Sequence, residues 1–367
     1  MSSHIYVQRD GPRPYEHLRT GVSLHSHTLH SRESLDFVYR ALLRLPVLAG
    51  ELKKHVGPVD LSRGWWTPPL GPQEVWESER AQIEGLSLHP LISLTGHDNL
   101  EAPFALRHLA DSRDTPLSTE WTVPFGPTFF HLGVHNLPAA EAPVLFAQMQ
   151  DYRREPDMNR LGGILRELAR RPGVLTVLNH PLWDERGIGE AAHSEAVRYF
   201  LQLYRDNVHA IEINGLRPWS DNRAACSLAS GCGKPVISGG DRHALETNAV
   251  LNLTDAASFD EFVDEIRSGW SHVLVLRHYR EPHERRLLRN TLDILRSYER
   301  HAKGWRTWSD RAFFRCDDGQ IRTFTELIGP GARGPLNALL AAVQFASGPH
   351  RLRFLGGIVS AGNEVTR

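Results

Sequence analysis

Histidine side chains recur in this chain at positions where they could bind metal ions. The sequence contains 20 histidines in 367 residues. Two of them form the motif His25-Ser26-His27, at the end of the apolar run that begins at Gly21. Because side chains alternate along a strand, both imidazoles point to the same face and form a chelating pair. This motif therefore suggests a site for a divalent cation.

Further histidines and acidic residues accompany other apolar runs. In chain order they lie in Thr95-Gly96-His97-Asp98, at Glu120, at His131, in Asn179-His180-Pro181, at Glu212 and in Asp241-Arg242-His243. A lone histidine at a strand end is more often a hydrogen-bonded structural residue than a ligand. Several ionisable groups that converge in one place are costly to bury without a compensating charge, and metal cations supply that charge. The joint pattern therefore favours a metal site over a structural role.

Short strands that alternate with helices must bring these residues together. Seven apolar runs predict strands at Gly21–His25, Pro90–Thr95, Pro116–Val123, Thr128–Val134, Val174–Asn179, Val208–Ile213 and Pro235–Ser238. Between them lie helical stretches such as Arg160–Arg171, which Pro172-Gly173 ends. The alternation is typical of an α/β fold with a parallel sheet or barrel. In parallel barrels active sites assemble at the C-terminal ends of the strands, where these polar residues are expected.

Two regions depart from the alternation. The segment Gly57–Gln73 contains Trp65 and Trp66 and is interpreted as a long loop. After residue 280 the pattern predicts two amphipathic helices, one with Leu288, Leu292 and Leu295 and the other with Leu336, Leu339, Leu340 and Val343. We therefore expect a metal-binding barrel over residues 1–280 and a mainly helical C-terminal extension over residues 281–367.

The ordered motifs resemble those of the PHP (polymerase and histidinol phosphatase) superfamily over about residues 18–280. The matching segments are Leu24-His25-Ser26-His27-Thr28, Thr95-Gly96-His97-Asp98, Glu120 with Phe130-His131-Leu132-Gly133, His180-Pro181 and Gly240-Asp241-Arg242-His243. The resemblance implies a distorted (β/α)7 TIM-like barrel with a trinuclear metal centre. It also implies phosphoester hydrolysis.

Metal ligands follow from the resemblance residue by residue. One ion would be held by His25, His27, Glu120 and Asp241. Glu120 would bridge to a second ion, held by His131 and His180. A third ion would be held by His97, His243 and an acidic residue after the first motif, for which Glu33 is the first candidate and Asp36 the second.

Some positions are ambiguous or depart from the family pattern. His135 rivals His131, because residues four apart share one face of a strand. Gly96 stands where the family has Asp, and Gly240 where Ser is usual. The change at Gly96 removes a side chain that could orient a metal-bound histidine.

Three further residues are candidates for contact with substrate. Arg32 and Arg217 lie nearest in sequence to the predicted rim and could bind phosphate oxygens, although solvated surface arginines are equally common. Arg242 should point away from Asp241 and His243 and pair outside the site. Asp98, or a metal-bound water, could act as the general acid.

The donor set mixes imidazole nitrogen with carboxylate oxygen and lacks thiolate, which suits two or three divalent ions of Mn, Zn or Fe. A carboxylate that bridges two ions holds them about 3.5–4 Å apart, so that they share a hydroxide of near-neutral pKa. We expect this hydroxide to attack a small phosphomonoester. The pattern predicts no particular oligomeric state.

Composition excludes several other classes. Lys+Arg 42 against Asp+Glu 43 gives a net charge of -1, which does not favour nucleic acid and gives no reason to expect a membrane partner. Hydrophobic content of 41% is that of a folded globule. Residues 1–14 contain no apolar signal segment, so we expect a cytoplasmic protein. Cys226, Cys232 and Cys316 have no paired spacing and are expected to be free thiols.

Three alternative functions remain open at this point. A phosphodiesterase or nuclease-like enzyme could use the same ligands. An amidohydrolase commonly bridges two ions with a modified strand-end lysine, but none of the four lysines lies at a predicted ligand-bearing strand end. A non-catalytic metal-containing binding module is the third alternative, and metal analysis with phosphatase assays would separate the three.

Overall fold

The first of two large sheets contains the strand that carries His25 and His27. The computed structural model describes residues 2–11, 13–35, 63–298, 301 and 303–327. The strand order is β1 (Ser2–Val7), β12 (Trp270–Val275), β11 (Val250–Thr254), β2 (Thr20–Leu24) and β5 (His89–Ser93). β2 and β5 are parallel, whereas β11 runs antiparallel to both β2 and β12. The strands β1, β11 and β12 are additions to the predicted set.

A second sheet contains the remaining predicted strands. Its order is β10 (Val236–Gly239), β9 (Ala210–Asn214), β8 (Leu175–Asn179), β7 (Thr128–His135) and β6 (Thr119–Phe125). β8, β9 and β10 are parallel. β7 is antiparallel to both neighbours, and it forms a hairpin with β6 in which Gly126 adopts a φ of 57°. The expectation of an all-parallel sheet is therefore wrong at β7, because apolar periodicity carries no information about strand direction.

Isolated backbone bridges connect the two sheets at the candidate site. One bridge joins Ser26 to Arg242, and the other joins His97 to Glu120. Within the described residues these bridges do not extend into ladders, so the strands form separate sheets and no closed barrel. The α/β class is as expected, and both bridges lie at candidate ligands or their sequence neighbours.

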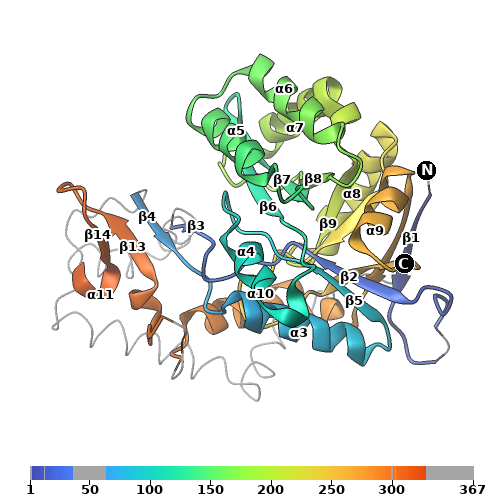
Figure 1. Ribbon diagram of the computed structural model, residues 1–367, viewed down its shortest axis with the longest axis horizontal. Helices are drawn as coiled ribbons and strands as arrows, with labels where there is room; N and C mark the ends of the chain where they lie inside the picture. Colours follow the sequence, from blue (N-terminus) through green and yellow to red (C-terminus); the bar gives the residue numbers. More distant parts are fainter. Residues whose placement is uncertain (1, 12, 36–62, 299–300, 302, 328–367) are drawn as a thin grey trace.

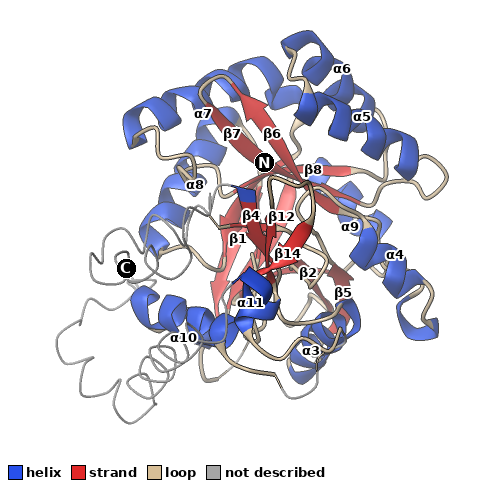
Figure 2. Ribbon diagram, turned by 90° about the vertical axis from the view of Figure 1, so that its left-hand side faces the viewer, coloured by secondary structure: helices blue, strands red, loops and turns tan. Residues whose placement is uncertain are grey.

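Helices cover the outer faces of the large sheets (Figure 2). They are α3 (Pro72–Gly85), α4 (Glu101–Arg107), α5 (Ala142–Arg154), α6 (Met158–Ala169), α7 (Glu190–Tyr204), α8 (Trp219–Cys232) and α9 (Phe259–Arg267). α6 matches the helix predicted over Arg160–Arg171. Asp157 caps it by accepting a hydrogen bond from Arg160 N at 2.8 Å, and Leu161, Ile164, Leu165 and Leu168 are buried.

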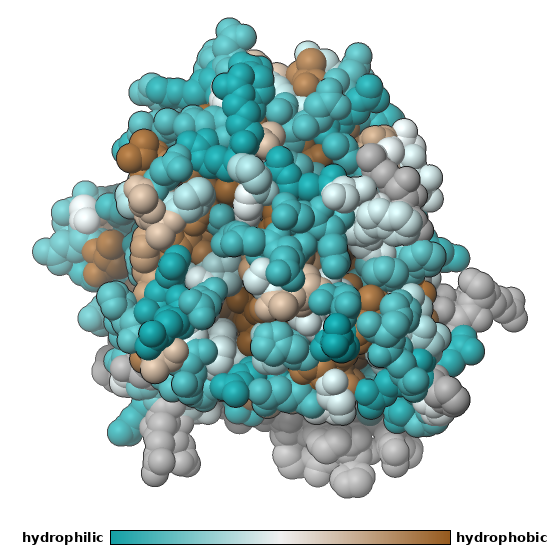
Figure 3. All heavy atoms as spheres, turned by 45° about the vertical axis from the view of Figure 1, so that its right-hand side comes forward, coloured by the Kyte–Doolittle hydropathy of each residue, from teal (hydrophilic) through white to brown (hydrophobic). Residues whose placement is uncertain are grey.

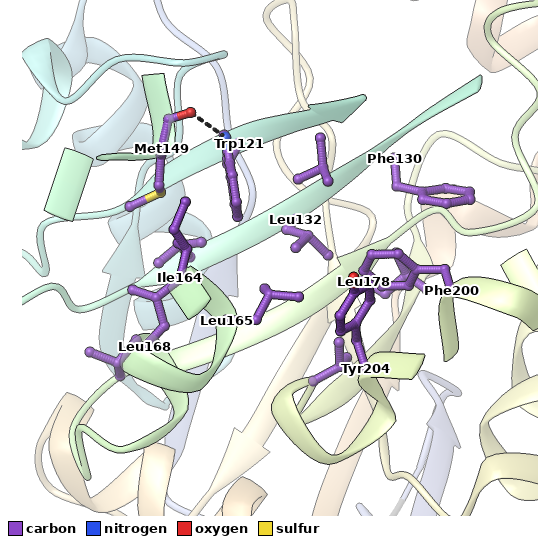
Figure 4. Close-up of a cluster of buried hydrophobic side chains, with 14 of the residues drawn as sticks. Trp121, Phe130, Leu132, Met149, Ile164, Leu165, Leu168, Leu178, Phe200 and Tyr204 are labelled. Atoms are coloured by element: carbon purple, nitrogen blue, oxygen red, sulfur yellow. Dashed lines mark hydrogen bonds between the residues drawn. The ribbon is translucent and has the colours of Figure 1, made fainter. Parts of the chain in front are cut away.

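The largest hydrophobic core lies between β6–β8 and the helices α5–α7 (Figure 4). Trp121 is completely buried in it, and its indole Nε1 donates to the Met149 carbonyl at 3.2 Å. Leu132 and Leu178 contribute from β7 and β8. One outer face of the molecule is mainly hydrophilic with small dispersed hydrophobic patches (Figure 3). Burial on this scale holds rigid the hairpin that carries Glu120 and His131.

A third, small sheet stands apart from the large ones in Figure 1. Its order is β14 (Ile321–Thr323), β13 (Ala312–Arg315), β4 (Gly64–Trp66) and β3 (Glu33–Ser34). Trp65 and Trp66 thus lie in a strand, which corrects the loop interpretation for the described part of Gly57–Gln73. Cross-strand pairing with β13 determines this conformation, and so distant a partner leaves no local signal in the sequence.

The C-terminal segment contains α10 (His283–Leu295) and α11 (Phe324–Leu327) besides β13 and β14. α10 matches the first predicted amphipathic helix. The second, at Leu336–Val343, lies outside the described residues, and the domain division at residue 280 stays a prediction. Short 3-10 helices occur at Ala110–Ser112, Arg205–Asn207, Arg277–Arg280 and Trp308–Asp310.

Two expectations from composition can be compared with the structure. Cys226, Cys232 and Cys316 are free, as predicted. Among the helices of the described segments, none combines the length and the apolar character needed to cross a bilayer.

Candidate metal centre

The two histidines of the first motif converge on one carboxylate. β2 ends at Leu24, and His25 follows with a left-handed backbone φ of 64°. The Nε2 atoms of His25 and His27 lie 3.0 and 3.1 Å from Glu120 Oε2. Both rings are 1% exposed. The predicted pairing of the two imidazoles on one side of the chain is therefore observed, although His25 itself lies beyond the strand.

Glu120 lies at the centre of the cluster, near the start of β6, and is completely buried. Its Oε2 also lies 3.4 Å from His97 Nδ1. Its Oε1 lies 3.1 Å from His180 Nε2 and 3.6 Å from His131 Nδ1, and accepts a hydrogen bond from Asn179 Nδ2 at 3.0 Å. The two oxygens thus face different sets of imidazoles, which is the geometry that a bridging carboxylate needs.

Glu33 gathers a second set of histidines. Its Oε2 lies 3.2 Å from His97 Nε2 and 3.1 Å from His243 Nε2. Its Oε1 lies 3.5 Å from His27 Nδ1. The structure therefore places Glu33 where the third ligand set requires an acidic residue, whereas the alternative, Asp36, lies outside the described residues.

Asp241 completes the centre from the end of β10. Its Oδ1 lies 3.6 Å from the Nε2 atoms of both His25 and His27. Its backbone φ of 52° is left-handed, as is that of His180 at 25°. Such conformations cost about 1–3 kcal/mol each in non-glycine residues and persist only where the surroundings enforce them. Three strands, β2, β8 and β10, thus end in strained turns that aim donor groups at one place.

The nine predicted ligands are the side chains that the structure brings together. Described residues form four groups in which donor atoms lie within 4.8 Å of one another: His27, Glu33, His97 and His243; His25, His27 and Glu120; His25, His180 and Asp241; His97, Glu120 and His131. Together these are six imidazoles and three carboxylates. Their contact with an ion stays a prediction.

Buried polar atoms that lack a hydrogen-bond partner test whether these residues fit metal ions. His25 Nε2, His27 Nε2, Glu33 Oε1 and Glu120 Oε2 are buried without a hydrogen-bond partner. Buried polar atoms are nearly always satisfied, so each such atom needs an explanation. All four belong to the candidate ligand groups, and divalent cations would satisfy them. The donor set therefore fits a metal centre.

The charges of the cluster are strongly coupled. Burial alone would lower the pKa of His25, but neighbouring carboxylates, Glu120 first, raise the pKa well above its usual value. The pKa of His97 is likewise raised against burial, first by Glu33. Burial opposes charge on Glu120, yet the imidazoles around it hold its pKa well below the usual range. Burial lowers the pKa of His131, which favours the neutral ring that a metal ion requires.

Polar neighbours orient several candidate ligands. Glu212 Oε1 lies 2.6 Å from His25 Nδ1, and Ser31 Oγ lies 3.0 Å from His27 Nδ1. Asn179 holds Glu120 as described above. The sequence marked Glu212 as a strand-end acid but gave it no role, and it gave no role to Ser31. The backbone hydrogen bond from His97 N to Ser31 Oγ, at 3.0 Å, shows that one hydroxyl serves two motifs.

His131 and His135 occupy different surroundings on β7. His131 faces Glu120, whereas His135 Nδ1 lies 2.8 Å from Ser93 Oγ. Burial lowers the pKa of His135 to about 3. His135 takes part in none of the four groups found among the described residues. The geometry therefore agrees with the choice of His131.

A cavity of about 820 Å³ opens beside the cluster. Its lining consists of Arg32, Glu33, Ser34, His97, Asp98, Thr122, Pro124, Gly126, Pro127, Thr128, Phe129, His131, Arg153, Glu185 and Arg186. Arg32 and Asp98 both line this cavity, and their contact with a substrate stays a prediction. Asp98 Oδ1 accepts from Thr122 N at 2.9 Å, and its Oδ2 lies 3.2 Å from Arg153 Nε. Burial raises the pKa of Asp98.

Arg217 and Arg242 do not line this cavity. Arg217 stacks on Trp183, with its guanidinium carbon 3.5 Å from the ring centroid, and its Nη2 is 3.8 Å from Asp241 Oδ2. It lines a separate small cavity of about 10 Å³ behind His180. Arg242 forms a buried ion pair with Glu79 at 2.8 Å, outside the cluster as expected.

The two glycines that depart from the family pattern have a steric reason. A Cβ at Gly96 would lie 2.6 Å from Asn99 Nδ2. A Cβ at Gly240 would lie 1.6 Å from Asn248 Oδ1. Asparagine side chains fill both spaces, and Asn99 donates to the His97 carbonyl at 3.0 Å. Asn99 therefore supports the His97 backbone from the space that a side chain at position 96 would need.

Comparison with known proteins gives distant structural similarities. No family model and no curated protein matches the chain. An amidohydrolase from Chromobacterium violaceum, with bound sulfate and no metal, has a TM-score of 0.37 at 16% identity, covering 60% of this chain and 87% of that chain. A proposed metal-dependent phosphoesterase from Bifidobacterium adolescentis has a TM-score of 0.38 at 14% identity, covering 71% and 98%.

PsfC from Pseudomonas syringae has a TM-score of 0.43 at 12% identity, covering 75% of this chain and 97% of that chain. With TM-scores and identities this low, the three similarities carry no argument about function.

Proposed function

We propose that this protein is a metal-dependent phosphoesterase of the PHP type that hydrolyses small phosphomonoesters. The observation that carries the proposal is the position of Glu120, whose two carboxylate oxygens face separate imidazole sets within 3.6 Å. The seven strands β2 and β5–β10 correspond to the seven strands predicted from the sequence, and their arrangement as a (β/α)7 barrel is part of this proposal. Two sheets connected by isolated bridges fit a distorted form of that barrel.

Divalent ions of Mn, Zn or Fe, two or three in number, would activate water and neutralise charge on the phosphoryl group when bound. His25, His27, Glu120 and Asp241 would hold the first ion. His131 and His180 would hold the second with Glu120. His97, His243 and Glu33 would hold the third.

The cavity beside the cluster supports a phosphorylated substrate of modest size. Arginine side chains bind phosphate oxygens through paired N–H groups. Arg32, Arg153 and Arg186 line the wall of the cavity, and Glu33, His97 and His131 line the side that faces the cluster. A phosphoryl group in this cavity could therefore reach the candidate ligands with some of its oxygens while its other oxygens contact an arginine. Arg32 would contribute directly to phosphate binding.

Asp98 would donate a proton to the leaving-group oxygen. Its carboxyl lines the cavity next to His97, and it is anchored by Thr122 N and Arg153. Arg217 would keep Asp241 in place from behind, because Asp241 lies between it and the two histidines of the first motif. This role replaces the expected contact with substrate phosphate.

Hydrolysis of an aryl phosphate monoester and of the matching diester tests the proposal. The full-length protein should turn over the monoester faster, and chelator should abolish this activity. Glu120→Gln should remove activity and bound metal, whereas the exposed control Glu77→Gln on α3 should change neither. Faster diester turnover would favour the nuclease-like alternative, and bound metal without turnover of either ester would overturn the proposed enzymatic function.

A further inference from the structure

The small third sheet connects the candidate metal centre to the C-terminal segment. Glu33 on β3 pairs with Trp66 on β4, and Trp66 pairs with Ala312 on β13. β3 is only two residues long, and β4 is its sole strand partner within the described part of the chain. The backbone position of Glu33 therefore depends on β4, which is itself held by β13.

A separate hydrophobic core holds these strands together. Its buried members are Leu35, Trp66, Ala312, Phe314 and Phe324. Leu35 comes two residues after Glu33, and Phe314 belongs to β13. Packing between them is tight, since a Cβ at Gly64 would lie 2.6 Å from both Leu35 Cδ1 and Phe314 Cε1. A glycine at position 64 is therefore what allows β3, β4 and β13 to approach this closely.

Arg311 connects the end of β4 to the C-terminal segment through hydrogen bonds. Its side chain is 0% exposed, and its Nη1 donates to the Thr67 carbonyl at 2.7 Å. Its Nη2 donates to the carbonyl of Ile294 at the end of α10. Thr67 N in turn donates to the Arg311 carbonyl at 3.0 Å. These bonds satisfy the buried guanidinium with backbone oxygens from two distant segments, so its removal would leave both unpaired.

The β3 edge of the same sheet lies at the metal centre. Glu33 contacts His97 and His243 as described above. The Trp66 ring lies 6.1 Å from the His243 ring, centroid to centroid. One short strand pair thus contributes both a carboxylate to the cluster and an indole beside it.

From these contacts we infer that residues 311–315 position Glu33 and so determine metal binding by the group His27, Glu33, His97 and His243. This inference rests on the metal centre of the proposed function. The C-terminal segment would then be part of the centre, although no residue of 281–327 belongs to the four ligand groups in the described residues. Displacement of β13 should weaken this one group and leave the Glu120 groups filled.

Metal stoichiometry of full-length variants tests the inference. Phe314→Ala removes an aromatic side chain from the hydrophobic core that also contains Leu35 and Trp66. Glu33→Gln removes the carboxylate itself. Each variant, dialysed against Mn²⁺ and analysed by mass spectrometry and calorimetry, should lose about one ion per chain or bind its weakest ion roughly 10–100-fold less tightly. Phe314→Leu should recover part of the loss because it refills the core.

Two controls separate positioning from general destabilisation. Phe262→Ala truncates an equally buried phenylalanine on α9, in a different core, and should keep every ion. Ile321→Ala changes a half-exposed residue of β14 and should also keep every ion. Gly64→Ala, which pushes Leu35 and Phe314 apart without removing a side chain, takes the place of Phe314→Ala if that variant does not fold.

Different results distinguish failure of this inference from failure of the proposed function. If Glu33→Gln loses an ion while Phe314→Ala and Gly64→Ala bind Mn²⁺ like the wild type, the inference is overturned and the proposed function stands. If the wild-type protein binds no divalent ion, the proposed function itself fails. Equal loss of ions in Phe314→Ala and Phe262→Ala would also overturn the inference, because the effect would then follow stability alone.

Discussion

Glu212 Oε1 lies 2.6 Å from His25 Nδ1, and both side chains are 1% exposed. Because a carboxylate only accepts, His25 Nδ1 donates in this pair, and Nε2 is left to face Glu120 and Asp241. Glu212 Oε2 also accepts from His180 N at 2.8 Å. One carboxylate that is not a predicted ligand therefore orients two residues that are.

Glu212→Gln should weaken metal binding without removing a ligand. The amide keeps the size of the side chain but reduces its ability to accept from His25 and His180 N. Loss of such supporting hydrogen bonds typically costs 10–100-fold in metal affinity. Calorimetric titration with Mn²⁺ measures the change, with exposed Glu77→Gln as the matched control, and an unchanged affinity would contradict the role assigned to Glu212.

Chelation should lower the stability of the fold. Ions that bind only the native state add about 2.7 kcal/mol per site to the free energy of unfolding when their concentration is one hundred times Kd. Thermal unfolding with EDTA should therefore occur at a lower temperature than with Mn²⁺, and added Mn²⁺ should restore the higher value. Identical unfolding curves under the two conditions would argue against a metal centre built from these residues.

Arg242→Ala should destabilise the protein although Arg242 lies between two candidate ligands. The substitution leaves Glu79, which is 0% exposed, without its ion-pair partner. Breaking a buried pair in this way costs about 3–5 kcal/mol. Urea unfolding at constant Mn²⁺ measures the loss.

Arg80→Ala is the matched control for Arg242→Ala. It breaks the exposed pair between Arg80 and Glu84 on α3 and should destabilise the protein much less than Arg242→Ala, because solvent screens an exposed ion pair. If the two substitutions had equal effects, the Arg242–Glu79 pair would not be the stabilising contact that the structure indicates.

The buried imidazole of His209 should make the stability of the fold depend on pH, whether or not metal is bound. Its Nδ1 accepts from Thr176 N at 2.9 Å, and burial lowers its pKa to about 3. Between pH 6.5 and 3 the unfolded chain binds a proton that the native state does not. The contribution of His209 to stability is therefore complete above pH 6.5 and is lost as the pH falls toward 3.

His209→Asn keeps an acceptor at the position of Nδ1 but does not titrate. Its unfolding free energy should fall less steeply with acid than that of the wild type over the same range. Chemical unfolding of metal-free protein at a series of pH values measures both slopes. Parallel slopes would show that His209 is protonated equally in the folded and unfolded chain.

The strands could be predicted where apolar runs are bounded by turn residues, as in β8 and β9. The direction of β7 could not be predicted. Two strands joined by a hairpin, as at Gly126, show the same apolar periodicity as two strands joined by a crossover. β3 could not be predicted either, since two residues carry no period and their conformation comes from β4 and β13.

Part of the candidate site could likewise be predicted from the sequence, and part of it could not. Spacing alone indicated His25 and His27, and the resemblance to a family supplied Glu33. Spacing could not distinguish Glu120 from Glu212, since both are buried strand glutamates. The resemblance selected Glu120, and the three-dimensional arrangement places it at the centre of the imidazole cluster. The left-handed turns at His25 and Asp241 are equally invisible in the sequence, because tertiary contacts rather than glycine enforce them.

Anomalous diffraction from crystals soaked with Mn²⁺ tests the central claim most directly. At least two peaks are expected in bonding contact with the donor atoms of the cluster, one of them beside His25 Nε2 and both in contact with Glu120. Crystals that diffract well but show no anomalous peak near Glu120 would contradict it.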